Sequence, residues 1–215
     1  MDWFKRNMIA VGMACFMAMQ PAMADDYGAV RDEQTFRKEL VRKTSAVTSI
    51  QARFVQEKYL SVFSSTVKSE GFFWWQKSDK ICLDYRTPVK YRIVIAGDRI
   101  KTVSGGKSTV INTKGNPMMD QMSQLIASCM TGNLAAMGAG FSMLVQESAK
   151  DYRITITPVD KSVKNYIARM EIHLDKSDLS VNRLVMYENE ADYTAYIFSD
   201  KKFNETIPAQ VFDVR

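Results

Sequence analysis

Few residues in this chain combine a reactive side chain with a spacing that could support catalysis. The only histidine, His173, lies between Ile172 and Leu174 in an alternating strand pattern, which favours a structural role. Carboxylates such as Asp151 and Asp160 fall at expected turns, where aspartate is common. The sequences H-E-x-x-H and G-x-S-x-G, which supply zinc ligands or a nucleophile, are absent. We therefore expect a binding protein without metal or cofactor. A catalytic site assembled from distant residues is the alternative.

Two further patterns fall short of a phosphate site and of a disulfide framework. The segment Gly105–Ser108 resembles the end of a phosphate-binding loop, but the first glycine of that loop is replaced by Lys101. A hairpin turn explains these glycines better. Cys82 and Cys129 are the only cysteines after the N-terminal segment, so they could form one disulfide or remain thiols.

The methionines are the most informative feature of the composition. Of the 14, six lie in the first 23 residues and six between Met118 and Met143. Asn116 and Pro117 can start a helix that Gly132 ends, with apolar residues three and four positions apart. Methionine adapts to variable apolar shapes, so we interpret this helix as a movable lid, with permanent packing on the core as the alternative. The lid residues are Met118, Met119, Met122, Leu125, Ile126 and Met130.

The first 24 residues have the layout of a secretory signal peptide. Lys5 and Arg6 precede an apolar stretch over residues 8–19, and Ala22-Met23-Ala24 is a small-residue cleavage site. We expect export to the periplasm, cleavage after Ala24, and a single domain over residues 25–215. The net charge of +5 is mild and its basic residues are dispersed, so we expect no nucleic-acid partner.

The rest of the chain predicts a mainly β fold with some helix. Apolar spacing predicts an amphipathic helix over Arg31–Thr44, and Gly97-Asp98 predicts a hairpin turn. About ten or eleven strands with turns between them favour one strongly curved antiparallel sheet, whose concave apolar face the two helices would cover. The expected strands begin at Ser49 and continue with Val67–Gln76, Ile81–Arg86, Tyr91–Ile95, Ile100–Val103, Thr109–Asn112, Phe141–Val145, Tyr152–Pro158, Ile167–Leu174, Val181–Tyr187 and Tyr193–Phe198.

The order of these elements resembles the periplasmic outer-membrane lipoprotein carrier family, LolA. The resemblance rests on Phe54-x-Gln56, on Gly71 with Trp74, on a strand ending at Pro88, and on a C-terminal pattern of Phe203-Asn204, Ile207-Pro208 and Phe212. It implies an incomplete, half-open β-barrel closed by a helical lid. It also implies a monomer that takes acylated lipoproteins from an ATP-driven inner-membrane release complex and delivers them to an outer-membrane acceptor that the sequence does not identify.

Strand parity together with the resemblance selects candidate site residues. The expected wall of the acyl-binding cavity consists of Phe54, Phe73, Trp75, Ile81, Leu83 and Tyr85, for which ordinary core packing is the alternative. Family members typically have Arg-Pro where this chain has Lys77-Ser78, so Lys77 is the candidate latch for the lid, with Lys80 or Arg86 as substitutes. Because the chain ends at Arg215, we expect no counterpart of the further C-terminal segment of some carriers.

Two other functions compete with transport. A lipid-sensing or envelope-stress-sensing regulatory module could use the same fold and signal to a membrane partner. A transmembrane β-barrel would need strands that alternate between an apolar outer and a polar inner face. The internal helices and the bulky run Phe72–Trp75 argue against the second.

Overall fold

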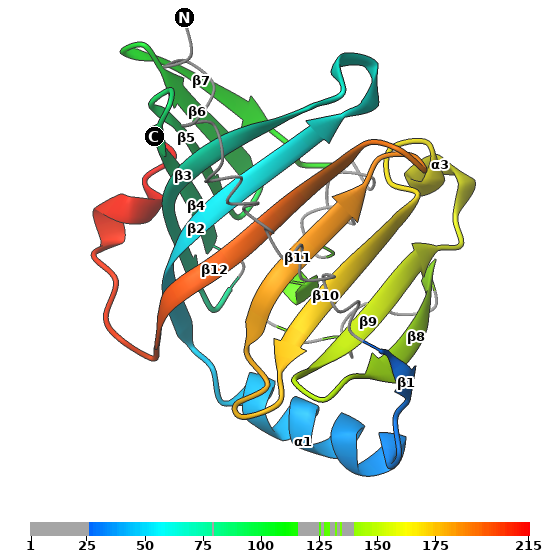
Figure 1. The fold of residues 1–215 in the computed structure, drawn as a ribbon. Helices are drawn as coiled ribbons and strands as arrows, with labels where there is room; N and C mark the ends of the chain where they lie inside the picture. The colour runs from blue at the N-terminus through cyan, green and yellow to red at the C-terminus, as the bar shows by residue number, and fades with distance from the viewer. Residues whose placement is uncertain are drawn as a thin grey trace, which may run out of the picture.

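The strands form one antiparallel sheet in a computed structural model that describes residues 26–78, 80–115, 125, 127–129, 132, 134 and 140–215. Twelve strands in the order β1-β8-β9-β10-β11-β12-β2-β3-β4-β5-β6-β7 make up the sheet (Figure 1). Their bounds are β1 Gly28–Ala29, β2 Ser49–Leu60, β3 Ser65–Gln76, β4 Lys80–Thr87, β5 Tyr91–Ala96, β6 Arg99–Ser104, β7 Lys107–Asn112, β8 Phe141–Glu147, β9 Asp151–Pro158, β10 Arg169–Asp175, β11 Val181–Tyr187 and β12 Tyr193–Phe203.

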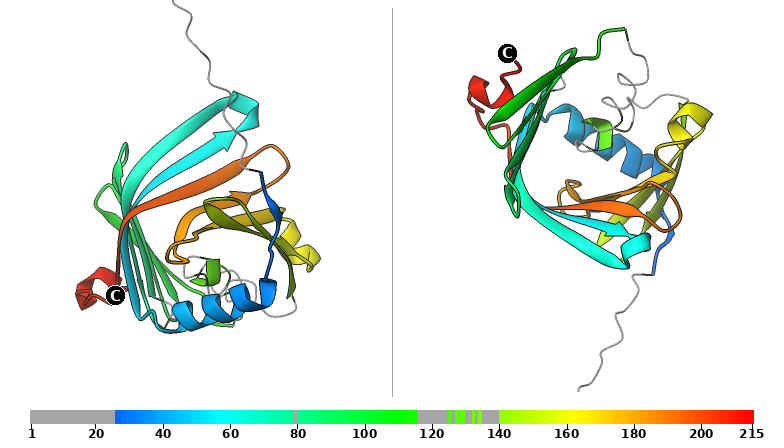
Figure 2. Two further views of the ribbon diagram at one scale, coloured as in Figure 1. Left: turned by 60° about the horizontal axis from the view of Figure 1, so that its bottom comes forward. Right: turned by 90° about the horizontal axis from the view of Figure 1, so that it is seen from above.

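The sheet curls without closing, since its two edge strands, β1 and β7, do not pair with each other. Figure 2 shows it wrapped around a hollow, with helix α1 (Glu33–Ser45) across one open end. The expected curved sheet is confirmed, but the expected ten or eleven strands are too few. The additional strand is β1, whose two residues are too short to show an alternating pattern. The Gly97-Asp98 hairpin is confirmed, with Gly97 at a φ of +58°.

Helix α1 begins and ends where local chemistry favours it. The Asp32 carboxylate accepts a hydrogen bond from the Thr35 backbone N–H at 2.9 Å, and Arg42 and Lys43 occupy the last turn. Its bounds differ from the expected Arg31–Thr44 by two residues at the start and one at the end. Phe36 and Leu40 are buried toward the sheet, so the amphipathic pattern gave the correct inner face. The other described helices are short: η1 Ser61–Phe63, α3 Lys161–Lys164 and η3 Ala209–Phe212.

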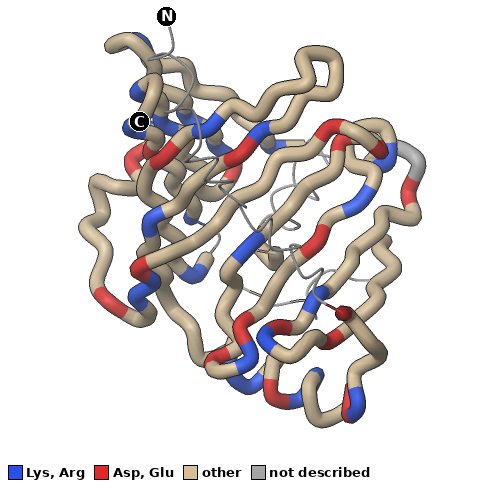
Figure 3. Tube along the Cα trace, viewed as in Figure 1, with Lys and Arg blue, Asp and Glu red and all other residues tan. Residues whose placement is uncertain are grey.

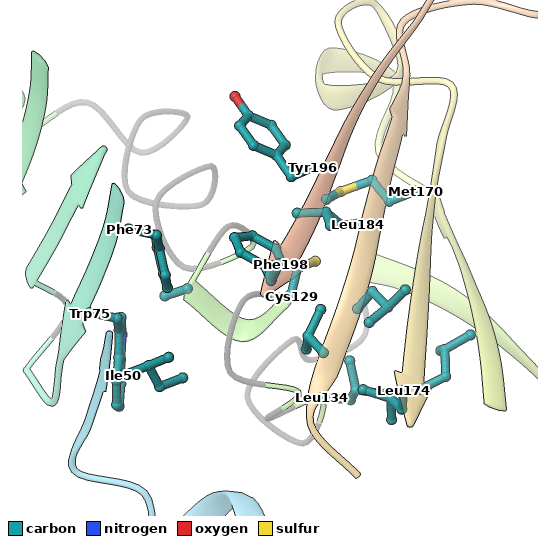
Figure 4. Close-up of a cluster of buried hydrophobic side chains, with 14 of the residues drawn as sticks. Ile50, Phe73, Trp75, Cys129, Leu134, Met170, Leu174, Leu184, Tyr196 and Phe198 are labelled. Carbon is teal, nitrogen blue, oxygen red and sulfur yellow. The ribbon is translucent and has the colours of Figure 1, made fainter. Parts of the chain in front are cut away.

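Part of the central segment also packs inside the curve. Leu125 and residues 127–129 are helical, and Leu125, Cys129 and Leu134 are buried in the main apolar cluster. Figure 4 shows Cys129 and Leu134 between side chains of β3 and those of β10–β12. The remaining lid candidates, Met118, Met119, Met122, Ile126 and Met130, lie outside the described residues, so the extent of the expected lid stays a prediction.

A second, smaller cluster lies on the opposite face of the sheet. Ile207 and Phe212, from the C-terminal segment, pack there against Cys82 and Val94. The Arg92 guanidinium of β5 donates a hydrogen bond to the Val211 carbonyl at 3.1 Å, which holds the C-terminal segment against the sheet. Cys82 and Cys129 belong to different clusters and are both free thiols, so the disulfide does not form. Burial raises the pKa of both thiols and keeps them neutral.

Candidate functional site

The concave face carries rows of large apolar side chains that follow the strand register. Across β2, β3, β4 and β5, Ala52 pairs with Phe73, Phe73 with Leu83, and Leu83 with Ile93. The neighbouring rows, two residues away, are Ile50–Trp75–Ile81–Ile95 and Phe54–Gly71–Tyr85–Tyr91. All six expected wall residues belong to these rows, and all six are buried in the main cluster: Phe54, Phe73, Trp75, Ile81, Leu83 and Tyr85.

Gly71 creates space within the third row. A Cβ added to Gly71 would lie 2.9 Å from Cζ of Phe54 and even closer to the backbone carbonyl of Asp84. No real Cβ contact is that short, so only glycine leaves room for the tip of the Phe54 ring and the Asp84 carbonyl at this position. The ring then meets Tyr85 and Tyr196 edge-on, with centroid distances of 5.0 and 5.7 Å.

A cavity lies between the C-terminal half of α1 and this face. Its volume is about 370 Å³, and its apolar lining includes Ile50, Ala52, Phe73, Val181 and Phe198. Figure 4 shows Phe73 and Phe198 projecting toward each other from opposite sides of this interior. Protein pockets that bind ligands span about 300–1,000 Å³, so the space is sufficient for a small apolar group.

The charged residues that line the cavity are mainly basic. Arg42, Lys43 and Lys201 line it together with a single acid, Asp178. Lys201 is held in place by hydrogen bonds to the side chains of Ser180 and Asn182. Burial lowers the pKa of Lys201, against the attraction of nearby carboxylates. Figure 3 shows basic and acidic residues interspersed along the strands that face the viewer.

The structure relates the expected site to this cavity only in part. Of the six wall candidates, only Phe73 lines the cavity. The other five belong to the same apolar face but are covered by other side chains. Alternation in the sequence predicts which face of the sheet a side chain is on, but it does not predict which segments pack against that face. Sequence reasoning missed Ala52 and Phe198 as cavity residues. The inward parity that Phe198 shares with Tyr196 was the signal that could have identified it.

A polar cluster interrupts the apolar face beside the Phe54 ring. The Gln56 side-chain amide donates to the Tyr196 hydroxyl at 3.0 Å, and the hydroxyls of Tyr196 and Tyr85 are also 3.0 Å apart. Burial is the main cause that raises the pKa of both tyrosines, so both hydroxyls keep their protons at neutral pH. On the same face, the buried indole N–H of Trp75 has no hydrogen-bond partner in the part of the chain that the structure describes.

The latch candidates lie in different surroundings. Lys77 follows β3 in an exposed turn, where its backbone N–H donates to the Thr48 carbonyl at 2.9 Å, and its latch role stays a prediction. Lys80 is half-buried at the start of β4. The Arg86 guanidinium pairs with the Asp84 carboxylate at 2.6 Å and lies over the Phe72 ring. The roles of Lys80 and Arg86 as substitute latches also stay predictions.

His173 has the structural surroundings that its sequence context predicts. Its Nδ1 lies 3.0 Å from the Asp151 carboxylate, which also accepts a hydrogen bond from the Tyr27 hydroxyl at 2.7 Å. These contacts fasten the residues before β1 to the outer face. Within the described part of the chain, no three acids, histidines or cysteines are placed to hold a metal ion. Among the same residues, no helix has the length and apolar content needed to span a membrane.

Comparison with known proteins gives one family and a set of distant structural neighbours. The model of the family described as outer membrane lipoprotein carrier protein LolA matches residues 45–215. A LolA superfamily protein from Nitrosomonas europaea is 10% identical, with a TM-score of 0.44, and the match covers 82% of this chain and 96% of that one. No curated protein sequence matches the chain.

Two further solved structures are similar to this chain at the same low level of sequence identity. The Mycobacterium tuberculosis lipoprotein LppX is 13% identical with a TM-score of 0.41, covering 81% of this chain and 96% of its own. The structure of the Pseudomonas aeruginosa MucA/MucB complex is 13% identical with a TM-score of 0.45, covering 85% of this chain and 60% of that one.

Proposed function

Because the chain belongs to the LolA family of outer-membrane lipoprotein carriers, we propose that it shields lipoprotein acyl chains while they cross the periplasm. The observation that carries this proposal is the cavity of about 370 Å³ between α1 and the concave face, with its lining of Ile50, Ala52, Phe73 and Phe198. In this proposal residues 1–24 are a leader that directs export and is then removed. The mature chain moves cargo from the inner to the outer membrane.

The energetics of acyl burial suit such a carrier. Each buried methylene is worth about 0.8 kcal/mol, so one sixteen-carbon chain represents roughly 12 kcal/mol before any costs. A cavity that retained all of this energy would not release its cargo. Leu125, Cys129 and Leu134 already pack on the concave face, where they compete with a ligand and lower its net affinity. Opening toward the ligand would therefore displace protein contacts of the same apolar kind.

The proposed partners follow from the same role. Cargo would arrive from an ATP-driven inner-membrane release complex, and an outer-membrane acceptor that we do not identify would receive it. The carrier would act as a monomer. No step of this cycle needs catalysis by the carrier, because shielding and release involve no covalent change.

Native mass spectrometry of the full chain, expressed with its leader and purified from the periplasm, tests this proposal. We expect a mass that begins at Asp25 and a fraction of molecules that carry lipid or an acylated peptide. A protein that is empty and also fails to bind a synthetic triacylated lipopeptide would contradict the proposal. Co-purification of a transmembrane regulator in place of lipid would favour the sensory alternative.

A further inference from the structure

The polar cluster formed by Gln56, Tyr85 and Tyr196 lies where an acyl carrier needs no polar group. Tyr85 and Tyr196 are both buried, and the Phe54 ring lies edge-on to each of them. The Phe198 ring, which lines the cavity, stacks on Tyr196 with an interplanar angle of 10°. Figure 4 shows the Tyr196 hydroxyl pointing away from Phe198. The cluster therefore lies one ring from the cavity wall.

Counting protons shows that this cluster has one donor too many. Tyr85 and Tyr196 each carry one hydroxyl proton, but only one of these protons can occupy the contact between them. The Gln56 amide donates to Tyr196, so it does not accept the other proton. Rotating the amide by 180° makes Gln56 the acceptor but frees both of its own N–H protons. Those N–H protons can reach solvent, because Gln56 is only half-buried. In the orientation that the structure shows, one buried tyrosine hydroxyl proton has no acceptor among the described residues.

Trp75 adds a second unpaired donor to the same face. Its buried indole N–H has no partner among the described residues, and it lies four residues along β3 from Gly71, which pairs with Tyr85. An unpaired donor in an apolar interior is unfavourable and is normally matched by an acceptor. A bare hydrocarbon offers no acceptor. The ester and amide linkages of acyl chains offer carbonyl oxygens, which accept hydrogen bonds and carry no charge.

We infer that the Gln56–Tyr196–Tyr85 cluster recognises a carbonyl oxygen at the base of a bound acyl chain, so that the protein distinguishes acyl from alkyl chains. This inference rests on the proposed function, since it concerns the ligand of the same apolar face. Apolar burial would give most of the affinity, and the donor would set how deeply the chain lies. The same carbonyl occurs in lipoproteins and in glycerophospholipids, so both sources need to be tested.

The experiment compares ester-linked ligands with ether-linked ligands of equal chain length. One pair is a dipalmitoyl lipopeptide and its dihexadecyl ether analogue, and the second pair is the corresponding ester and ether phosphatidylglycerols. We expect the full chain to bind the ester form about three- to tenfold more tightly, the effect of one hydrogen bond. A preference confined to one pair would assign the carbonyl to that source.

Two conservative variants locate the effect. The double variant Tyr85→Phe/Tyr196→Phe removes both hydroxyl protons and should abolish the ester preference while leaving affinity for the ether ligand within about twofold. Either single variant still has one hydroxyl proton without a partner among the described residues, so it should keep part of the preference. Tyr91→Phe is the matched control, because Tyr91 lies on the same face with its ring centroid 6.0 Å from that of Tyr85 and should keep the preference. Thermal melting confirms that each variant folds.

The possible failures are distinct. If the wild type binds both members of each pair equally, the carbonyl inference is wrong while the carrier proposal stands. A preference that survives undiminished in the double variant Tyr85→Phe/Tyr196→Phe would also overturn it. If the wild type binds none of the four ligands, the carrier proposal itself fails, and the inference fails with it.

Discussion

At the scale of single residues, Gly71 has the clearest structural reason for its identity. Alanine at this position would press its Cβ against Phe54 and the Asp84 carbonyl, and the backbone contact cannot move aside easily. We expect Gly71→Ala to lower the free energy of unfolding by about 1–3 kcal/mol, as overpacking does, measured by urea denaturation. Gly28→Ala is the matched control, since nothing lies within 4 Å of its added Cβ. Equal stability of the two variants would contradict the packing argument.

Alternation in the sequence predicts which side chains face inward but not what they contact. Phe73 and Trp75 have the same parity and are both buried, yet only Phe73 lines the cavity. The difference arises because α1 and the β10–β11 turn approach the sheet above Phe73, and such approaches depend on chain segments far apart in sequence. The bond between Gln56 and Tyr196 likewise joins residues 140 positions apart.

At the scale of elements, the turn between β10 and β11 shapes the cavity and depends on an ionised carboxylate. Asp175 accepts hydrogen bonds from the backbone and hydroxyl of Ser177, and another from the Asn182 amide. These bonds lower the pKa of Asp175 to about 2. A lowered pKa in the folded state means that the stabilisation is complete above the unfolded pKa of about 3.9. It is lost as the pH falls toward 2.

Asp175→Asn should therefore reduce the dependence of the free energy of unfolding on pH in the acid range. We expect the free energy of unfolding of the wild type to fall between about pH 4 and pH 2. The asparagine variant should lose less over that interval, by about 0.2–1 kcal/mol, because the carboxylate is partly solvated. Urea denaturation at several pH values measures both curves. Parallel curves for the two proteins would show that Asp175 does not contribute.

Elements with strong local signals are the ones that sequence predicts well. Helix α1 has an N-cap at Asp32 and an apolar stripe through Phe36 and Leu40, so its position was clear within two residues. Strand β1 is held by pairing with Gln146 and Glu147 of β8 and by the Tyr27 contact to Asp151. All of these partners are more than 100 residues away in the sequence, so no short-range sequence pattern predicts strand β1.

At the scale of the molecule, the decisive contact is the pairing of β12 with β2. Strands β2–β7 and β8–β12 each follow in sequence as neighbours, and the β12–β2 ladder joins the two groups into one curved sheet. Adjacent hairpins are predictable from turns and alternation. The joining ladder pairs Phe198 with Phe54, and it creates the shared concave face that neither group has alone.

Photo-crosslinking from two adjacent phenylalanines tests the central claim most directly. Phe73 and Phe72 have the same side chain, but Phe73 lines the cavity with 1% exposure while Phe72 lies on the outer face with 38% exposure. A photoactivatable phenylalanine analogue replaces each in turn, and the full chain is mixed with a tritiated palmitoyl lipopeptide. The carrier account predicts a label on the protein modified at position 73 and little or none at position 72. Equal labelling at both positions, or labelling only at 72, would contradict it.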